Sequence, residues 1–100
     1  MGKEDRPIER TANLIGGKWT LLILYDLLEG KKRFGELRTS LTGISPRTLT
    51  EKLRFLEREG IVERKIYPEV PPRVEYSLTQ RGREMAPIFE AMRVWGSQWA

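Results

Sequence analysis

The chain has 100 residues, enough for one compact core and too few for a second domain of ordinary size. These residues include neither Cys nor His, which excludes disulfides, thiol redox sensing, Cys or His metal ligands and histidine acid–base catalysis. The 18 Lys and Arg outnumber the 14 Asp and Glu, and the net charge of +4 points weakly toward an anionic partner such as nucleic acid.

Enzymatic, cofactor-dependent and membrane functions find little support in the sequence. The Asp, Glu, Ser and Lys residues show no paired spacing typical of a catalytic site, so we expect no enzyme, no metal and no cofactor. The longest apolar stretch, residues 19–28, is about half of the ~20 residues that a membrane-spanning helix needs. Residues 1–6 are not followed by an apolar stretch of signal-peptide length, so we expect a cytoplasmic protein.

The first two predicted elements are helices. Residues 7–15 form the first one, and Ile8, Ala12 and Ile15 lie on one side of it. Residues 18–29 form the second, which is apolar nearly all round and is therefore expected to be buried on most sides. This second helix is the predicted centre of the core.

Residues 34–59 show the pattern of two helices joined by a short turn. Phe34, Leu37 and Leu41 have helical spacing, and a turn over residues 42–45 follows them. The next helix has a capping Ser, a Pro at its first position and a leucine stripe; these residues are Ser45, Pro46, Leu49, Leu53 and Leu56. The pattern predicts a helix-turn-helix.

The polar side of this last helix carries the main functional prediction. One face carries Arg47, Glu51, Arg54 and Arg58, opposite the leucines. Arg can bind guanine, Glu can accept from cytosine and Thr can contact a thymine methyl group or a phosphate. We predict base contacts for Arg47, Thr48 and Glu51, and phosphate contacts for Arg54 and Arg58. The full set of candidates here is Ser45, Arg47, Thr48, Thr50, Glu51, Arg54 and Arg58. The alternative is a solvated face with internal ion pairs.

A β-hairpin is predicted over residues 61–78. Its two strands, residues 61–67 and 73–78, are rich in β-formers, and the loop of residues 68–72 contains three prolines, which make it stiff. A stiff hairpin after such a helix is typical of a wing. Lys65 and Arg73 near its tip are predicted to contact phosphates or the minor groove, and a purely structural hairpin is the alternative.

The last predicted helix, residues 79–99, begins at a capping Thr79 and should be kinked or divided at Pro87. Its apolar stripe consists of Met85, Ile88, Phe89, Met92, Trp95 and Trp99. So large a stripe favours dimerisation together with Ile8, Ala12 and Ile15. The stripe could also fold back on the chain's own core or line a pocket for an apolar effector.

Short motifs follow one another along nearly the whole chain. They are Pro7-Ile8-Glu9-Arg10, Leu14-Ile15-Gly16-Gly17-Lys18-Trp19-Thr20, Arg33-Phe34-Gly35-Glu36-Leu37, Gly43-Ile44-Ser45-Pro46, Leu53-Arg54, Leu56-Glu57, Gly60-Ile61-Val62, Pro71-Pro72-Arg73-Val74-Glu75-Tyr76-Ser77-Leu78-Thr79 and Gly82. In this order and at this spacing they resemble the HxlR family of bacterial transcriptional regulators.

The resemblance implies a homodimeric winged helix protein of the MarR-like type, which dimerises through its N- and C-terminal helices and acts as a repressor or an activator. Many members carry a Cys directly before the motif that starts at Pro7, and in some this Cys senses electrophiles or oxidants. Arg6 stands at that position here, which excludes thiol-based sensing. An effector would act otherwise, for example as an apolar ligand between Trp19 and the terminal helices.

Together these observations predict a mostly α fold with a small β-hairpin (α+β class), formed by one domain over residues 1–100. The helix-turn-helix occupies residues 34–59, the wing residues 61–78, and the dimerisation helices residues 7–15 and 79–99. The expected partners are a pseudo-palindromic double-stranded DNA site and a second copy of the chain. The competing interpretation is a winged-helix module that binds an acidic protein partner.

Overall fold

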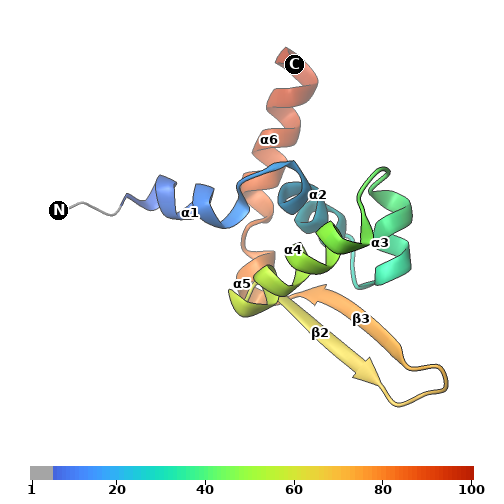
Figure 1. The fold of residues 1–100 in the computed structure, drawn as a ribbon. Helices are drawn as coiled ribbons and strands as arrows, with labels where there is room; N and C mark the ends of the chain where they lie inside the picture. The colour runs from blue at the N-terminus through green and yellow to red at the C-terminus, as the bar shows by residue number, and fades with distance from the viewer. Residues whose placement is uncertain (1–5) are drawn as a thin grey trace.

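The structure is a computed structural model that describes residues 6–100. In this part of the chain the elements are α1 (Pro7–Ile15), α2 (Lys18–Leu27), β1 (Lys32–Arg33), α3 (Phe34–Ser40), α4 (Pro46–Arg58), β2 (Val62–Tyr67), β3 (Arg73–Leu78), α5 (Gln80–Arg83) and α6 (Ala86–Trp99). Figure 1 shows α2, α3 and α4 as the body, from which α1, α6 and the β2–β3 hairpin extend in different directions. The predicted mostly α fold with a small sheet and a winged helix-turn-helix is confirmed.

The core forms where α2, α3 and α4 meet the base of the hairpin. The side chains with almost no exposed surface are Ile23, Leu24, Leu37, Leu49, Leu53, Leu56 and Ile61. They come from α2, α3, α4 and the start of the hairpin, so the apolar α2 lies in the centre, as its sequence predicts. Burial of these aliphatic side chains orients α4 and thereby fixes which of its sides faces solvent.

The sheet has three antiparallel strands in the order β1-β3-β2. Successive side chains of a strand point to opposite faces of the sheet, so one face of the hairpin is polar. This polar face consists of Glu63, Lys65, Tyr67, Arg73, Glu75 and Ser77. The opposite face contains Arg64, whose Nε lies 3.1 Å from an Oε2 oxygen of Glu57 in α4. The polar face therefore lies on the side of the hairpin that is turned away from α4.

The two-residue strand β1 is absent from the predicted elements. It exists because Lys32 and Arg33 pair with Tyr76 and Glu75 of β3. Two residues are too few to show an alternating pattern, so only the tertiary pairing defines this strand.

The predicted C-terminal helix is divided into α5 and α6. Thr79 caps α5 by accepting a hydrogen bond from the Gly82 N–H at 3.2 Å, and Pro87 lies in the first turn of α6. Pro is well accommodated there because its missing N–H has no helical partner at that position. The break predicted at Pro87 is confirmed. Over residues 6–100, no helix has both the length and the apolar character needed to span a membrane.

Candidate nucleic-acid interface

Helix α4 is fixed at its start and along one side. The Ser45 hydroxyl oxygen accepts a hydrogen bond from the Thr48 N–H at 3.0 Å, and Pro46 occupies the first turn. Leu49, Leu53 and Leu56 are buried in the core. The opposite side, which we call the arginine face (Arg47, Glu51, Arg54 and Arg58), is exposed along its whole length.

The first two members of the arginine face form an ion pair. The Arg47 Nε lies 3.3 Å from a Glu51 carboxylate oxygen, and 88% of the Arg47 side chain remains exposed. Surface pairs of this kind contribute only about 0–1 kcal/mol, so a stronger ligand can displace the contact. The predicted internal ion pairing therefore exists at this position and leaves both side chains accessible.

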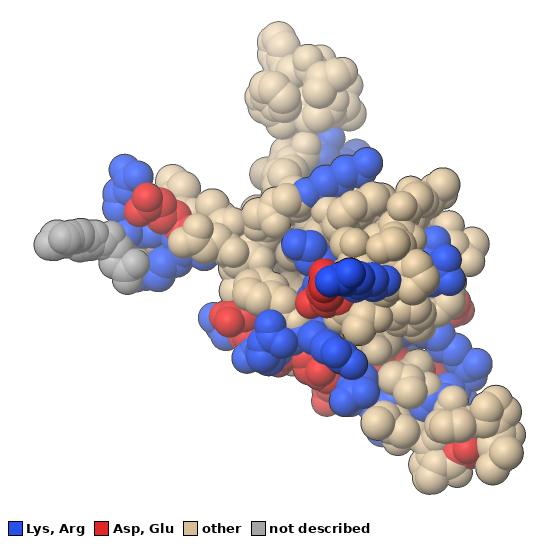
Figure 2. Space-filling model, viewed as in Figure 1, with Lys and Arg blue, Asp and Glu red and all other residues tan. Residues whose placement is uncertain are grey.

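The other two arginines, Arg54 and Arg58, are exposed and form no ion pair with the described residues. Arg54 of α4 is one of the charges that act on the hydroxyl group of Tyr76 in β3. Burial raises the pKa of that hydroxyl group, and the charges of Arg64, Glu57 and Arg54 modulate it. Figure 2 shows Lys and Arg atoms gathered over α4 and the base of the hairpin, with carboxylate atoms between them.

The three polar candidates beside the arginine face, Ser45, Thr48 and Thr50, are either hydrogen-bonded within the protein or half-buried. The Ser45 hydroxyl donates to the Thr48 hydroxyl at 3.0 Å while it caps the helix, so both are already hydrogen-bonded. Thr48 and Thr50 are half-buried, whereas Ser45 is exposed. These residues lie beside the face that a duplex would meet, and the role predicted for each of them stays a prediction.

The two wing candidates lie on the polar face of the hairpin. Lys65 is exposed, with its Nζ 5.1 Å from the centre of the Tyr67 ring. Arg73 stacks on the same ring at 4.0 Å and contacts Glu69 at 3.4 Å and Glu75 at 3.6 Å, with 30% of its side chain exposed. Arg73 is thus surrounded by partners inside the protein, whereas Lys65 is open to solvent.

One basic residue near α4 was missed by the sequence analysis. Arg64 lies on the hairpin face toward α4, where its Nε lies 3.1 Å from a carboxylate oxygen of Glu57. Its signal was present, because Arg64 alternates with the buried Val62 and so shares that face. The alternation alone does not show that this face of the hairpin is turned toward α4, which only the packing in the structure reveals.

The apolar stripes of α1 and α6 divide into a buried part and an exposed part. Ile15, Met85 and Phe89 belong to the core of the chain itself, as the alternative of folding back on the core expects, and their role in a dimer interface stays a prediction. Ala12, Ile88 and Met92 are exposed, and so are Ile8 (83% exposed), Trp95 (61%) and Trp99 (73%). The first turn of α6 therefore folds back on the core, and the rest of the helix extends from it.

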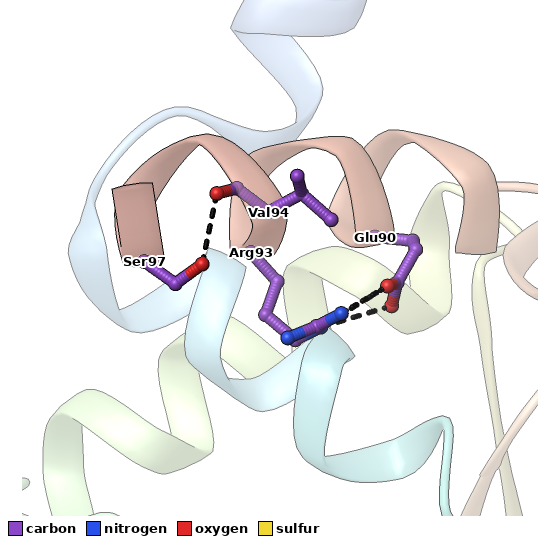
Figure 3. Close-up of polar contacts among 4 residues, drawn as sticks. All are labelled: Glu90, Arg93, Val94 and Ser97. Carbon is purple, nitrogen blue, oxygen red and sulfur yellow. Dashed lines mark hydrogen bonds and ion pairs between the residues drawn. The ribbon is translucent and has the colours of Figure 1, made fainter. Parts of the chain in front are cut away.

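An apolar groove of 270 Å³ lies between α2 and α6, lined by Leu21, Leu22, Tyr25, Phe89, Met92 and Arg93. At its edge, Arg93 and Glu90 of α6 form the ion pair drawn in Figure 3, where the Ser97 hydroxyl also donates to the Val94 carbonyl at 2.9 Å. The hydrogen bond from Arg93 holds the pKa of Glu90 below its ordinary value. Trp19 does not line this groove and instead packs near Gly43, and an effector site beside Trp19 stays a prediction.

A known protein family and several known regulators match most of this sequence. The family described as HxlR-like helix-turn-helix matches residues 14–100. The chain belongs to this family. The HTH-type transcriptional regulator sll1512 of Synechocystis sp. is 50% identical over 93% of this chain and 69% of its own length, and YdeP of Bacillus subtilis is 48% identical over 96% and 75%.

Solved structures of HxlR-like and related regulators superpose closely on this chain. A putative MarR-family regulator from Porphyromonas gingivalis has a TM-score of 0.93 at 39% identity, covering 100% of this chain and 98% of its own. The redox regulator HypR in its reduced form has a TM-score of 0.89 at 49% identity, covering 92% and 91%. The chain is therefore a helix-turn-helix transcriptional regulator, and its relatives are regulators rather than enzymes.

Proposed function

We propose that this HxlR-like regulator binds a specific sequence of double-stranded DNA as a homodimer. The observation that carries the proposal is the arginine face of α4, which the buried leucines on the other side hold in solvent. A helix presented in this way fits the major groove, where each base pair displays a distinct set of donors and acceptors.

The N-terminal turn of α4 is the part that reads bases in this proposal, because that end of a recognition helix reaches deepest into the groove. Arg47 and Glu51 are exposed there and exchange their mutual ion pair for base edges, with Thr48 beside them. Arg54, Arg58 and the exposed Lys65 of the wing bind phosphates. Arg73 is left out of this set because Tyr67, Glu69 and Glu75 already surround its guanidinium group.

Dimerisation is proposed because α1 and the end of α6 expose apolar surface that the chain itself does not cover. A second apolar groove, of 420 Å³, lies between α1 and the first turn of α6 and is lined by Pro7, Ile8, Thr11, Ala12, Ile15 and Ile88. Two copies joined here place two α4 helices in successive major grooves, about 34 Å apart. The groove between α2 and α6 is the place for an apolar effector, if one binds.

Selection of duplexes from a random pool tests the proposal. The wild-type protein should enrich a two-fold-symmetric site, and its affinity should fall steeply with salt. Arg47→Ala should lose about 1–3 kcal/mol on that site and relax its base preference, whereas Arg58→Ala should weaken binding to all duplexes alike.

A pool without any enriched sequence would contradict the proposal. If an excess of scrambled duplex displaced the enriched one with equal affinity, the basic face would bind anions without reading sequence. An acidic protein partner would then be the better explanation.

A further inference from the structure

Glu75 is a largely buried carboxylate with one cationic side chain beside each of its two oxygens. It lies on β3, the middle strand, where its cross-strand partners are Arg33 on β1 and Lys65 on β2. The Lys31 Nζ lies 3.5 Å from one carboxylate oxygen, and the Arg73 Nε lies 3.6 Å from the other. Only 14% of the Glu75 side chain is exposed. The carboxylate thus connects the hairpin to the turn that precedes β1.

The guanidinium group of Arg73 is held on three sides. It lies 4.0 Å from the centre of the Tyr67 ring, within the range of an attractive cation–π contact. Glu69 approaches it at 3.4 Å from the tip of the hairpin, and Glu75 approaches it from the next position on the same face of β3. These contacts direct the guanidinium along the hairpin instead of away from it.

Lys31 and Arg73 bind the Glu75 carboxylate chiefly through their charge. The two Glu75 contacts, at 3.5 and 3.6 Å, are longer than good hydrogen bonds, and neither the Glu75 Oε1 nor the Arg73 Nε has a hydrogen-bond partner within residues 6–100. Burial alone would raise the pKa of the Glu75 carboxyl group. The Tyr67 hydroxyl, Lys31 and Arg73 outweigh this effect and keep the pKa below its ordinary value.

We infer that Glu75 is a positioning residue of the wing: its carboxylate binds Lys31 and Arg73, holds the hairpin against β1 and keeps Arg73 inside the protein instead of on a phosphate. Without this carboxylate, Lys31 loses its ion pair with the hairpin, Arg73 keeps only Glu69 as an anionic partner, and the hairpin separates from β1. The consequence for DNA rests on the function proposed above, and the consequence for the free protein does not.

Hydrogen exchange of the free protein tests the structural part. In Glu75→Gln, the backbone amides of β1, β2 and β3 should exchange several-fold faster than in the wild type, and the difference should shrink as salt screens the cations. Glu63→Gln is the matched control, because it removes the same charge from the same face and Glu63 forms no ion pair with the described residues. Glu75→Asp keeps a carboxylate and should stay close to the wild type.

The same variants on a scrambled duplex test the DNA part. The released cations of Glu75→Gln should steepen the slope of log K against log salt by at least ~0.9, the value for one phosphate contact, relative to Glu63→Gln. Equal slopes and equal exchange rates for the two variants would overturn the inference. If the wild type bound no duplex, the proposed function would fail, while the exchange data would still decide the role of Glu75.

Discussion

At the scale of single residues, Gly82 shows how closely two segments approach. A Cβ atom built on Gly82 would lie 2.4 Å from the carbonyl oxygen of Ile61 and 3.2 Å from a methyl group of Leu78. The first contact is with backbone, which cannot turn aside as a side chain can. Only a residue without a side chain allows α5 to pack against the start of the hairpin.

We therefore expect Gly82→Ala to lower the free energy of unfolding by about 1–3 kcal/mol, the usual cost of overpacking. Gly96→Ala is the control, since its Cβ would meet nothing within 4 Å on α6 and should stabilise the helix by about 0.5–1 kcal/mol. Urea unfolding of both variants measures the difference. Equal stabilities would show that α5 and the hairpin do not pack as described.

The charge on Glu75 predicts a pH dependence. Its pKa is lowered in the folded protein, so its contribution to stability is complete above the ordinary value of 4.5 and is lost as the pH falls through the lowered folded value. The groups on the facing residues are those of Lys31, Arg33, Lys65, Arg73 and Tyr67. The Glu69 carboxylate also contacts Arg73.

The wild type should consequently be more stable than Glu75→Gln at neutral pH, and the two thermal midpoints should converge below pH 4.5. The matched pair of wild type and Glu63→Gln separates the effect of Glu75 from the general titration of carboxylates. A gap that persisted unchanged in acid would mean that the Glu75 charge is not what stabilises the wing.

At the scale of elements, α4 depends on its cap. Removing the Ser45 hydroxyl in Ser45→Ala leaves the Thr48 N–H without its acceptor, and we expect a loss of about 1 kcal/mol in the free energy of unfolding. The first turn, which carries Arg47, should also fray, so binding to the selected duplex should weaken. Thermal unfolding and a binding titration measure the two effects. Ser45→Asn, which can still cap, should retain both properties.

The sequence predicted the elements well where one local signal decided them. Ser45 and Pro46 defined the start of α4, its leucines defined the buried side, and Pro87 predicted the division of the last helix. Strand β1 was missed because pairing with β3 alone creates it. The sequence could not predict that Phe89 is buried while Trp95 is exposed. Both belong to the same apolar stripe of one helix, and only tertiary packing distinguishes them.

The candidate site was predicted in part for the same reason. The exposure of the arginine face follows from α4 alone. The inward position of Arg73 depends on Tyr67, Glu69 and Glu75, and hence on the register of the hairpin, which no local pattern of charges reveals.

At the scale of the whole molecule, the chain is more extended than a compact domain of its length. The radius of gyration is 14.8 Å, whereas about 13 Å is usual for 100 residues. Figure 1 shows the cause, since α1 and α6 extend from the body. The outer end of α6 in Figure 2 carries neither Lys and Arg nor Asp and Glu atoms, in keeping with the exposed tryptophans there. Such a surface suits a subunit contact.

The combined variant Trp95→Glu and Trp99→Glu should therefore be monomeric in sedimentation at micromolar concentration, where the wild type should be dimeric. Both side chains are exposed, so the helical signal in circular dichroism should be retained. Val70→Glu places one carboxylate on the fully exposed tip of the wing and should leave the dimer intact. A wild-type chain that was already monomeric would contradict the proposed assembly.

Hydroxyl-radical footprinting of the wild-type protein on the duplex selected from the random pool tests the central claim most directly. We expect two protected patches on one side of the duplex, one helical turn or about 34 Å apart, each lost when Arg47→Ala replaces the wild type at the same concentration. Uniform protection along the duplex, or a footprint that Arg47→Ala leaves unchanged, would contradict the claim that the exposed face of α4 reads the DNA.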